Sequence, residues 1–97
     1  MRIEWLIWDD WNVDHIAEHG VEPEEVEQIC QHGPHLARRA GITRYGLPRY
    51  YVYGQTTSGR YLFIVLDREH KAIFYVVTAR DMTSAEKRMY RQIRRKK

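Results

Sequence analysis

The residues best suited to handle a phosphate group gather near the C-terminal end of the chain. An apolar run, residues 74–79, leads directly to Arg80, and residues 87–97 then carry seven bases and no acid. Like charges at this density repel one another on a helix, and a polyanionic partner relieves that repulsion. An arginine at a strand end beside such a helix, with Tyr90 on the helix, is typical of a site that holds a phosphate chain.

Two histidines, His15 and His19, stand four residues apart on one face of a predicted helix. That spacing could supply two ligands of a zinc site. No third ligand is obvious, however, and Glu18 does not follow the first histidine directly as the glutamate of metalloproteases does. A surface or packing role is the simpler interpretation of His15. His19 precedes Gly20 at the expected helix end, where the helix dipole favours a protonated imidazole, so it is a candidate general acid or phosphate contact.

Arginines and tyrosines are interspersed through the rest of the chain. Guanidinium groups bind phosphates and tyrosine rings stack on unpaired bases, so the mixture suits single-stranded RNA. Most of the tyrosines have strand spacing and are more simply explained as half-buried packing. For residues 94–97, the alternative to RNA binding is a frayed, solvated tail. The set consists of Arg44, Arg49, Arg60, Arg80, Arg88 and Arg91 with Tyr45, Tyr50, Tyr51, Tyr53 and Tyr90.

Local signals predict the helices that position these residues. Thr83 and Glu86 have the spacing of a capping box, so the basic helix is expected to begin near residue 83. Pro23 starts a helix whose inward face is Val26, Ile29 and Cys30, and which residues 33–34 end. An earlier helix is capped by Asp9 or Asp10 and ended by Gly20, with an apolar stripe of Trp11, Val13, Ile16 and Ala17.

The strands expected from apolar runs are residues 3–8, 36–39, 49–54, 60–66 and 72–79, with turns at 56–59 and 67–71. Short turns between the last three strands require an antiparallel meander. We therefore predict an α+β fold of two layers, in which an antiparallel sheet of three to five strands packs against two N-terminal helices, with a C-terminal helix.

The length and composition indicate one small domain, residues 1–97. The chain is 43% hydrophobic and 30% charged, as in folded globular domains. No signal peptide or membrane span is apparent, and the single cysteine, Cys30, cannot form an internal disulfide, so a cytoplasmic location is expected. Glycine-rich phosphate loops, paired catalytic carboxylates and a Ser-His-Asp arrangement are not visible, and no cofactor is expected.

The net charge of +3 conceals a strong asymmetry. Residues 1–31 carry nine acids and one base, whereas the remaining residues carry fifteen bases and four acids. Such a split indicates two surfaces for two kinds of partner. The basic surface suits nucleic acid, and the acidic surface suits either a basic protein or solvent.

Three segments in this order resemble the BrnT-type toxins, which are small ribonucleases of type II toxin–antitoxin systems with a fold related to RelE toxins. The segments are residues 8–21, with the pair His19-Gly20, residues 53–60, and residues 78–90, with Ala79-Arg80 and Glu86 four residues before Tyr90. The resemblance covers nearly the whole chain except residues 33–48.

The resemblance implies metal-independent cleavage of RNA, inhibition of translation, and neutralisation by a tightly bound, BrnA-like antitoxin whose own domain contacts DNA. It implies catalytic roles for His19, Arg49, Arg80 and Tyr90. The mechanism expected is attack of the ribose 2′-hydroxyl on the adjacent phosphorus, with Arg80 binding the scissile phosphate and His19 moving a proton nearby. The surrounding bases expected to bind RNA are Arg60, Arg88, Arg91, Arg94 and Arg95.

Two positions depart from the family pattern. Glu18 replaces the basic residue usual before the histidine, and residues 46–48 lack the acid usual before Arg49. These departures favour an alternative, a non-catalytic RNA- or protein-binding module of the same fold. The retained His19, Arg80 and Tyr90 favour the ribonuclease.

Overall fold

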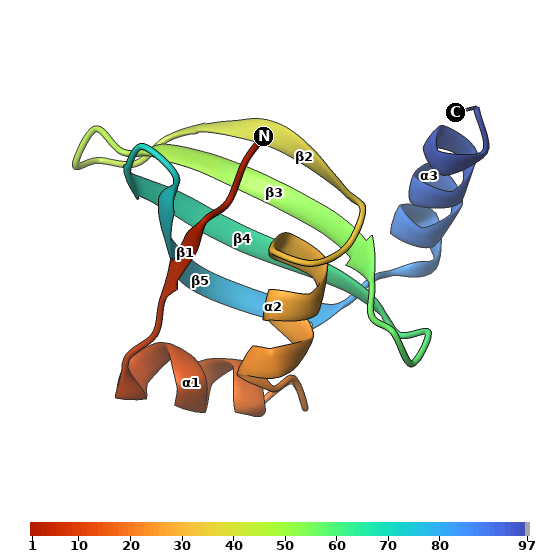
Figure 1. Cartoon of the computed structure of the whole chain (residues 1–97), viewed down its shortest axis with the longest axis horizontal. Coiled ribbons are helices and arrows are strands. Elements are labelled where there is room, and N and C mark those ends of the chain that lie inside the picture. Colours follow the sequence, from red (N-terminus) through yellow and green to blue (C-terminus); the bar gives the residue numbers. More distant parts are fainter. Residues whose placement is uncertain (97) are drawn as a thin grey trace.

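The computed structural model describes residues 1–96, in which three helices accompany a sheet of five strands (Figure 1). Lys97, the last base of the predicted helix, lies outside the described residues. The α+β class and the order of elements agree with the sequence-based expectation. None of the helices within residues 1–96 has the length and apolar character needed to cross a membrane. The elements are β1 (Trp5–Ile7), α1 (Asp10–Ala17), α2 (Pro23–Cys30), β2 (His35–Ile42), β3 (Pro48–Gln55), β4 (Tyr61–His70), β5 (Ile73–Asp81) and α3 (Ser84–Arg95).

The sheet has the order β1-β5-β4-β3-β2. Strands β2 to β5 form the expected antiparallel meander. The sheet as a whole is mixed, because β1 pairs with β5 in parallel, and this corrects the expectation of a purely antiparallel sheet. Two helices and three further strands separate β1 from β5 along the chain, so no tight turn forces the two strands to run in opposite directions.

Helix α1 begins with a capping box in which Asp9 and Asn12 each accept a backbone N–H of the other at 2.8 Å. It ends before Gly20, whose φ of 70° is the left-handed conformation that glycine adopts without strain. The predicted apolar stripe is partly wrong, because Trp11 is 61% exposed and Ala17 is also exposed. Asn12 is buried in their place, since its amide donates to carbonyl oxygens in β1 and β5.

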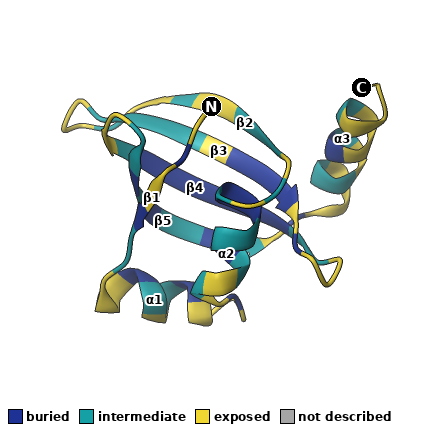
Figure 2. Ribbon diagram, in the orientation of Figure 1, coloured by how far each residue is buried: buried dark blue, intermediate teal, exposed yellow. Residues whose placement is uncertain are grey.

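Helices α1 and α2 cover one face of the sheet. The main hydrophobic core lies between these helices and that face (Figure 2). Helix α2 turns Val26, Ile29 and Cys30 inward as predicted, and burial raises the pKa of the Cys30 thiol to about 12. The helix lies very close to β3, because a Cβ on Gly54 would come within 2.4 Å of Ile29 Cγ2. A side chain at position 54 would therefore force Ile29 to shift.

Helix α3 packs on the other face of the sheet, which corrects the expected two-layer arrangement. Its buried residue Tyr90 belongs to a second cluster with Tyr53, Phe63, Val65 and Met82. Figure 1 shows α3 apart from α1 and α2 at the far end of the strands. The first face is already filled by two helices, so the apolar side of α3 is buried against aromatic residues of the opposite face.

Strand β4 extends to His70, so the turn predicted at residues 67–71 is shorter than expected. Asp67 remains in the strand and is buried, because its carboxylate accepts two hydrogen bonds from the Arg49 guanidinium at 2.7 and 3.0 Å. A polar residue in an apolar run favours a turn on sequence grounds, whereas Asp67 is half of a cross-strand ion pair.

Candidate nucleic-acid interface

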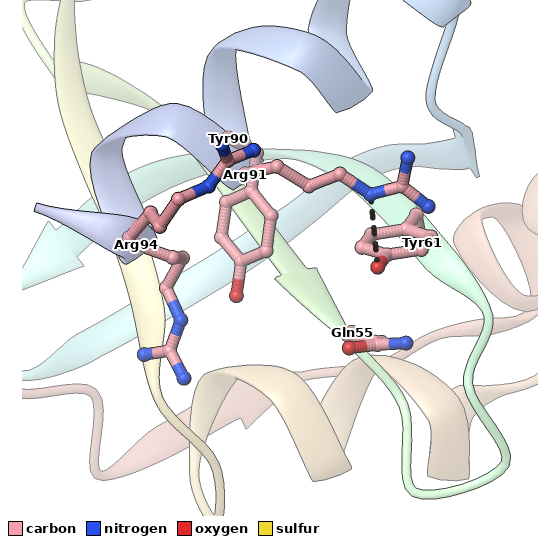
Figure 3. Close-up of a pocket in the computed structure, with 6 residues that line it drawn as sticks. Gln55, Tyr61, Tyr90, Arg91 and Arg94 are labelled. Atoms are coloured by element: carbon pink, nitrogen blue, oxygen red, sulfur yellow. Dashed lines mark hydrogen bonds between the residues drawn. The ribbon is translucent and has the colours of Figure 1, made fainter.

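A pocket of about 420 Å³ opens between α3 and the adjoining ends of β3 and β4 (Figure 3). Gln55 and Tyr61 face each other across the β3–β4 pair and form its strand side. We call this site the α3 pocket. It brings together four residues that the sequence analysis singled out separately, Tyr90 and three of the arginines. Its complete lining is Gln55, Tyr61, Tyr90, Arg91, Arg94 and Arg95.

Two tyrosine rings hold the arginine side chains of the α3 pocket. The guanidinium of Arg91 lies 5.0 Å from the centre of the Tyr61 ring, and its Nε donates to the Tyr61 hydroxyl at 3.3 Å (Figure 3). The guanidinium of Arg94 lies 6.0 Å from the centre of the Tyr90 ring. The two rings pack edge to face at 6.1 Å. Such contacts position a cation without neutralising it.

Tyr90 is only 4% exposed. Figure 3 shows its hydroxyl directed away from α3 into the pocket. Burial raises the pKa of the Tyr90 phenol, and the nearby charge of Arg94 opposes that rise. The phenol is therefore protonated at neutral pH, and it can donate a proton or a hydrogen bond but cannot serve as a base.

The arginines of the α3 pocket differ in their partners from Arg49, Arg60 and Arg80, which form ion pairs with carboxylates. Within residues 1–96, no ion pair involves Arg91, Arg94 or Arg95. The described residues that line the pocket include no carboxylate and no histidine. The pocket therefore presents uncompensated positive charge next to aromatic rings, which is the combination that binds a phosphodiester.

Arg80 lies outside the pocket and has its own partner. Its guanidinium donates to both carboxylate oxygens of Glu86 at 2.9 and 3.1 Å and lies 4.3 Å from the centre of the Phe63 ring. Glu86 also caps α3 by accepting the Thr83 N–H at 2.8 Å, as predicted. The Arg80 hydrogen bond is the main cause that holds the pKa of Glu86 below its ordinary value. Arg80 thus joins β5 to the start of α3.

Arg60 acts as a clamp between three parts of the chain. Its Nε and one terminal nitrogen donate to Asp81 at 2.7 and 3.3 Å, and it also donates to Glu25 at 3.1 Å. Further hydrogen bonds go to the carbonyl oxygens of Gly20 at 2.7 Å and His19 at 3.2 Å. These contacts occupy the five N–H donors of the guanidinium, so Arg60 is a structural residue and we exclude it from the RNA-binding set.

Arg49 and Arg88 also lie away from the α3 pocket. Arg49 is at the start of β3 and Gln55 at its end, about 20 Å apart along an extended strand. Its bidentate pair with Asp67 borders a separate pocket of about 450 Å³ at that end of the sheet. Arg88 is exposed on α3 but does not line the α3 pocket.

His15 lies on α1 and His19 follows its end, on the side of the sheet away from α3. His15 makes a 3.0 Å hydrogen bond with the Thr78 hydroxyl and stacks on Trp11. His19 is exposed, and its carbonyl belongs to the Arg60–Asp81 clamp. Successive side chains of a strand point to opposite faces, so Arg80 and Asp81 point apart. The structure therefore does not bring the side chains of His19 and Arg80 together.

Among the described residues, no three side chains of His, Cys, Asp or Glu gather closely enough to hold a metal ion.

The sequence analysis missed Gln55 and Tyr61 as site residues. Their signal was the hairpin turn between them, because a turn of that length places the residues at its two ends opposite each other.

The fold and the pocket together define a small, basic α+β domain with an arginine- and tyrosine-lined pocket beside its last helix. A family profile described as ribonuclease toxin, BrnT, of type II toxin–antitoxin system matches residues 8–86. The chain belongs to this family of ribonuclease toxins, as its motifs indicated. Membership implies RNA as the substrate and an antitoxin as the partner. No curated protein matches the chain at a significant level.

Proposed function

We propose that this chain is a metal-independent endoribonuclease that binds the scissile phosphodiester of RNA in the α3 pocket. One observation carries the proposal. Three arginines, none of which pairs with a carboxylate within residues 1–96, converge with two tyrosines in a single pocket. A planar guanidinium matches the oxygens of a phosphate better than any other side chain.

The proposed reaction is an internal transfer. The ribose 2′-oxygen forms a bond to the adjacent phosphorus as the bond from phosphorus to the 5′-oxygen breaks, which leaves a 2′,3′-cyclic phosphate and a 5′-hydroxyl. Arg91 and Arg94 stabilise the charge that develops on the phosphate oxygens. Tyr90, which stays protonated, donates its proton to the leaving 5′-oxygen. The proton of the 2′-hydroxyl passes to solvent.

The biological proposal follows from family membership. Cleavage of RNA inhibits translation in the cytoplasm, and a cognate BrnA-like antitoxin neutralises the toxin by binding it. The antitoxin, rather than this chain, contacts DNA. The acidic residues of α1 and α2 lie on the opposite face from α3, which supports separate surfaces for protein and RNA.

A second candidate function is a non-catalytic RNA-binding module. The observation that favours it is that the described lining of the α3 pocket contains no general base. Arg80 and Arg49, both expected to be catalytic, are engaged by carboxylates. This candidate retains RNA binding and the antitoxin partner but excludes cleavage.

The decisive experiment incubates purified protein with RNA in excess chelator, with and without ribosomes. We expect cleavage that leaves 2′,3′-cyclic phosphate ends. Tyr90→Phe should lower the cleavage rate by about 100-fold, because it removes the proton donor while keeping the ring. Arg91→Ala and Arg94→Ala should also reduce it, whereas Arg88→Ala on the same helix should not. Full activity of Tyr90→Phe would move the site elsewhere, and RNA binding without any cleavage would establish the second candidate.

His19→Ala distinguishes two assignments of the proton-transfer residue, His19 from the sequence and Tyr90 from the structure. The sequence analysis predicted that His19 works beside Arg80, and loss of its imidazole would then abolish cleavage. The structure-based proposal expects His19→Ala to retain activity. A loss comparable to that of Tyr90→Phe, in a variant that folds normally, would contradict the assignment of proton transfer to Tyr90.

A further inference from the structure

The sheet face that carries α3 continues beyond the helix. Strand alternation places Tyr51, Tyr53 and Gln55 on one face of β3. Gln55 lines the α3 pocket and Tyr53 is buried next to Tyr90. Tyr51 comes next along the strand and is 39% exposed. An exposed aromatic ring therefore lies about 13 Å from Gln55 on the same surface.

The ring of Tyr51 is held in place by its neighbours. It packs against Phe63 on β4, with 5.0 Å between the ring centres and 66° between the planes. Phe63 is itself buried and packs against Tyr53 at 5.3 Å. This edge-to-face contact fixes the ring while part of its surface stays open to solvent. Tyr51 thus differs from a mobile surface side chain.

One exposed cation lies beside this ring, and a second lies over the neighbouring Phe63. Arg38 is directly opposite Tyr51 in the β2–β3 pair, which puts their Cβ atoms about 5 Å apart. Arg38 is exposed and, within residues 1–96, takes part in no ion pair. On the other side, Arg80 lies over Phe63. Burial raises the pKa of the neighbouring Tyr53, and the charges of Arg38 and Arg80 oppose that rise.

We propose that Tyr51 and Arg38 form a second RNA subsite, in which an unpaired base stacks on the tyrosine and its phosphate contacts the arginine. The subsite rests on the proposed function, because it binds nucleotides of the same strand whose scissile phosphate occupies the α3 pocket. A base in a duplex is already stacked on both sides. The subsite therefore selects single-stranded RNA, and it does so with little dependence on sequence because every base has a stacking face.

The test measures the affinity of wild type and variants for a 2′-O-methyl oligonucleotide, which lacks the attacking hydroxyl and cannot be cleaved. Tyr51→Ala should weaken binding of the single strand by about 10- to 100-fold. Tyr51→Phe and Tyr51→Trp keep the ring and should bind like wild type. The matched control is Tyr45→Ala, since Tyr45 is also exposed, with Arg44 over its ring, but lies at the β2–β3 turn. It should leave the affinity unchanged.

The same measurement on a duplex of equal length separates stacking from general attraction. Tyr51→Ala should leave duplex binding unchanged, and an equal loss on both probes would overturn the proposal. Unchanged binding of the single strand by Tyr51→Ala, in a protein that still cleaves RNA, would overturn the subsite and leave the proposed function standing. The proposed function would instead be wrong if Arg91→Ala and Arg94→Ala bound the oligonucleotide with the affinity of wild type. Thermal unfolding of each variant confirms that the fold is intact.

Discussion

At the scale of single residues, the arginines of this toxin differ in what their N–H donors already bind. Arg49, Arg60 and Arg80 donate to carboxylates, which compensate their charge. Arg91 and Arg94 lie against tyrosine rings, which orient the guanidinium and leave most of its donors for a ligand. The first group stabilises the fold, and the second is suited to binding RNA.

The Arg80–Glu86 pair leads to an expected pH dependence of stability. Arg80 lowers the pKa of Glu86 below its ordinary 4.5. A carboxyl whose pKa is lowered by folding stabilises the protein above its unfolded pKa, and that stabilisation disappears as the pH falls through the folded pKa. Glu86→Gln, which keeps an oxygen to cap Thr83, should therefore cost about 1 kcal/mol near neutral pH, a figure that allows for solvent screening.

Urea unfolding of wild type and Glu86→Gln at a series of pH values measures this effect. The difference in the free energy of unfolding should shrink below pH 4.5 and vanish in stronger acid. Glu69→Gln, an exposed carboxylate outside the ion pairs of residues 1–96, is the control. A difference that stays constant over the whole pH range would show that the charge of Glu86 does not stabilise the fold.

At the scale of elements, α1 and α2 depend on the sheet for their positions. Each has eight residues, which is too short for a helix to be stable alone in water. Asn12 ties α1 to β1 and β5 through its two hydrogen bonds, and Ile29 of α2 lies directly on Gly54 of β3. The Arg60 clamp then joins the loop between these helices to the end of β5.

Gly54→Ala should destabilise the protein by about 1–3 kcal/mol, because its methyl group would overlap Ile29 and push α2 away from the sheet. Urea unfolding provides the measurement. Ile29→Ala is destabilising by itself, but it makes room for the methyl group, so the double variant should be less destabilised than the sum of the two single changes. Strict additivity would show that α2 does not rest on Gly54.

At the scale of the whole molecule, the charge asymmetry of the sequence becomes a separation in space. The acids of α1 and α2 lie over one face of the sheet, and the bases of α3 lie over the other. The Arg60 contacts with Glu25 and Asp81 lie on the side of α1 and α2. A polyanion approaching the α3 side is attracted without first passing the acidic helices.

The affinity for RNA should fall steeply as salt increases, because phosphate contacts release counterions. Changing Arg91, Arg94 and Arg95 together to alanine should reduce the slope of log affinity against log salt by about 2 for a single strand. Arg88→Ala should change it much less. The measurement is titration of a 2′-O-methyl oligonucleotide over a range of salt concentrations. An unchanged slope in the triple variant would mean that this part of α3 is a solvated helix end.

The sequence by itself determined the features that depend on neighbours within a few residues. The capping box of Thr83 and Glu86, the stop at Gly20 and the start at Pro23 were all predicted correctly, because caps and helix periods involve residues no more than four apart. The family resemblance, which the profile match confirms, rested on similar short motifs. The site assignments themselves remain predictions.

Only the tertiary structure decided which arginines have partners and which face each element covers. Arg49 meets an acid 18 residues away, and Arg60 meets a backbone carbonyl 40 residues away. The structure does not place the side chain of His19 beside that of Arg80, because adjacent residues of β5 point to opposite faces, and strand register brings Tyr61 to the α3 pocket. Contacts at such separations depend on the register of the sheet and the packing of helices on its faces, and local sequence patterns carry no information about either.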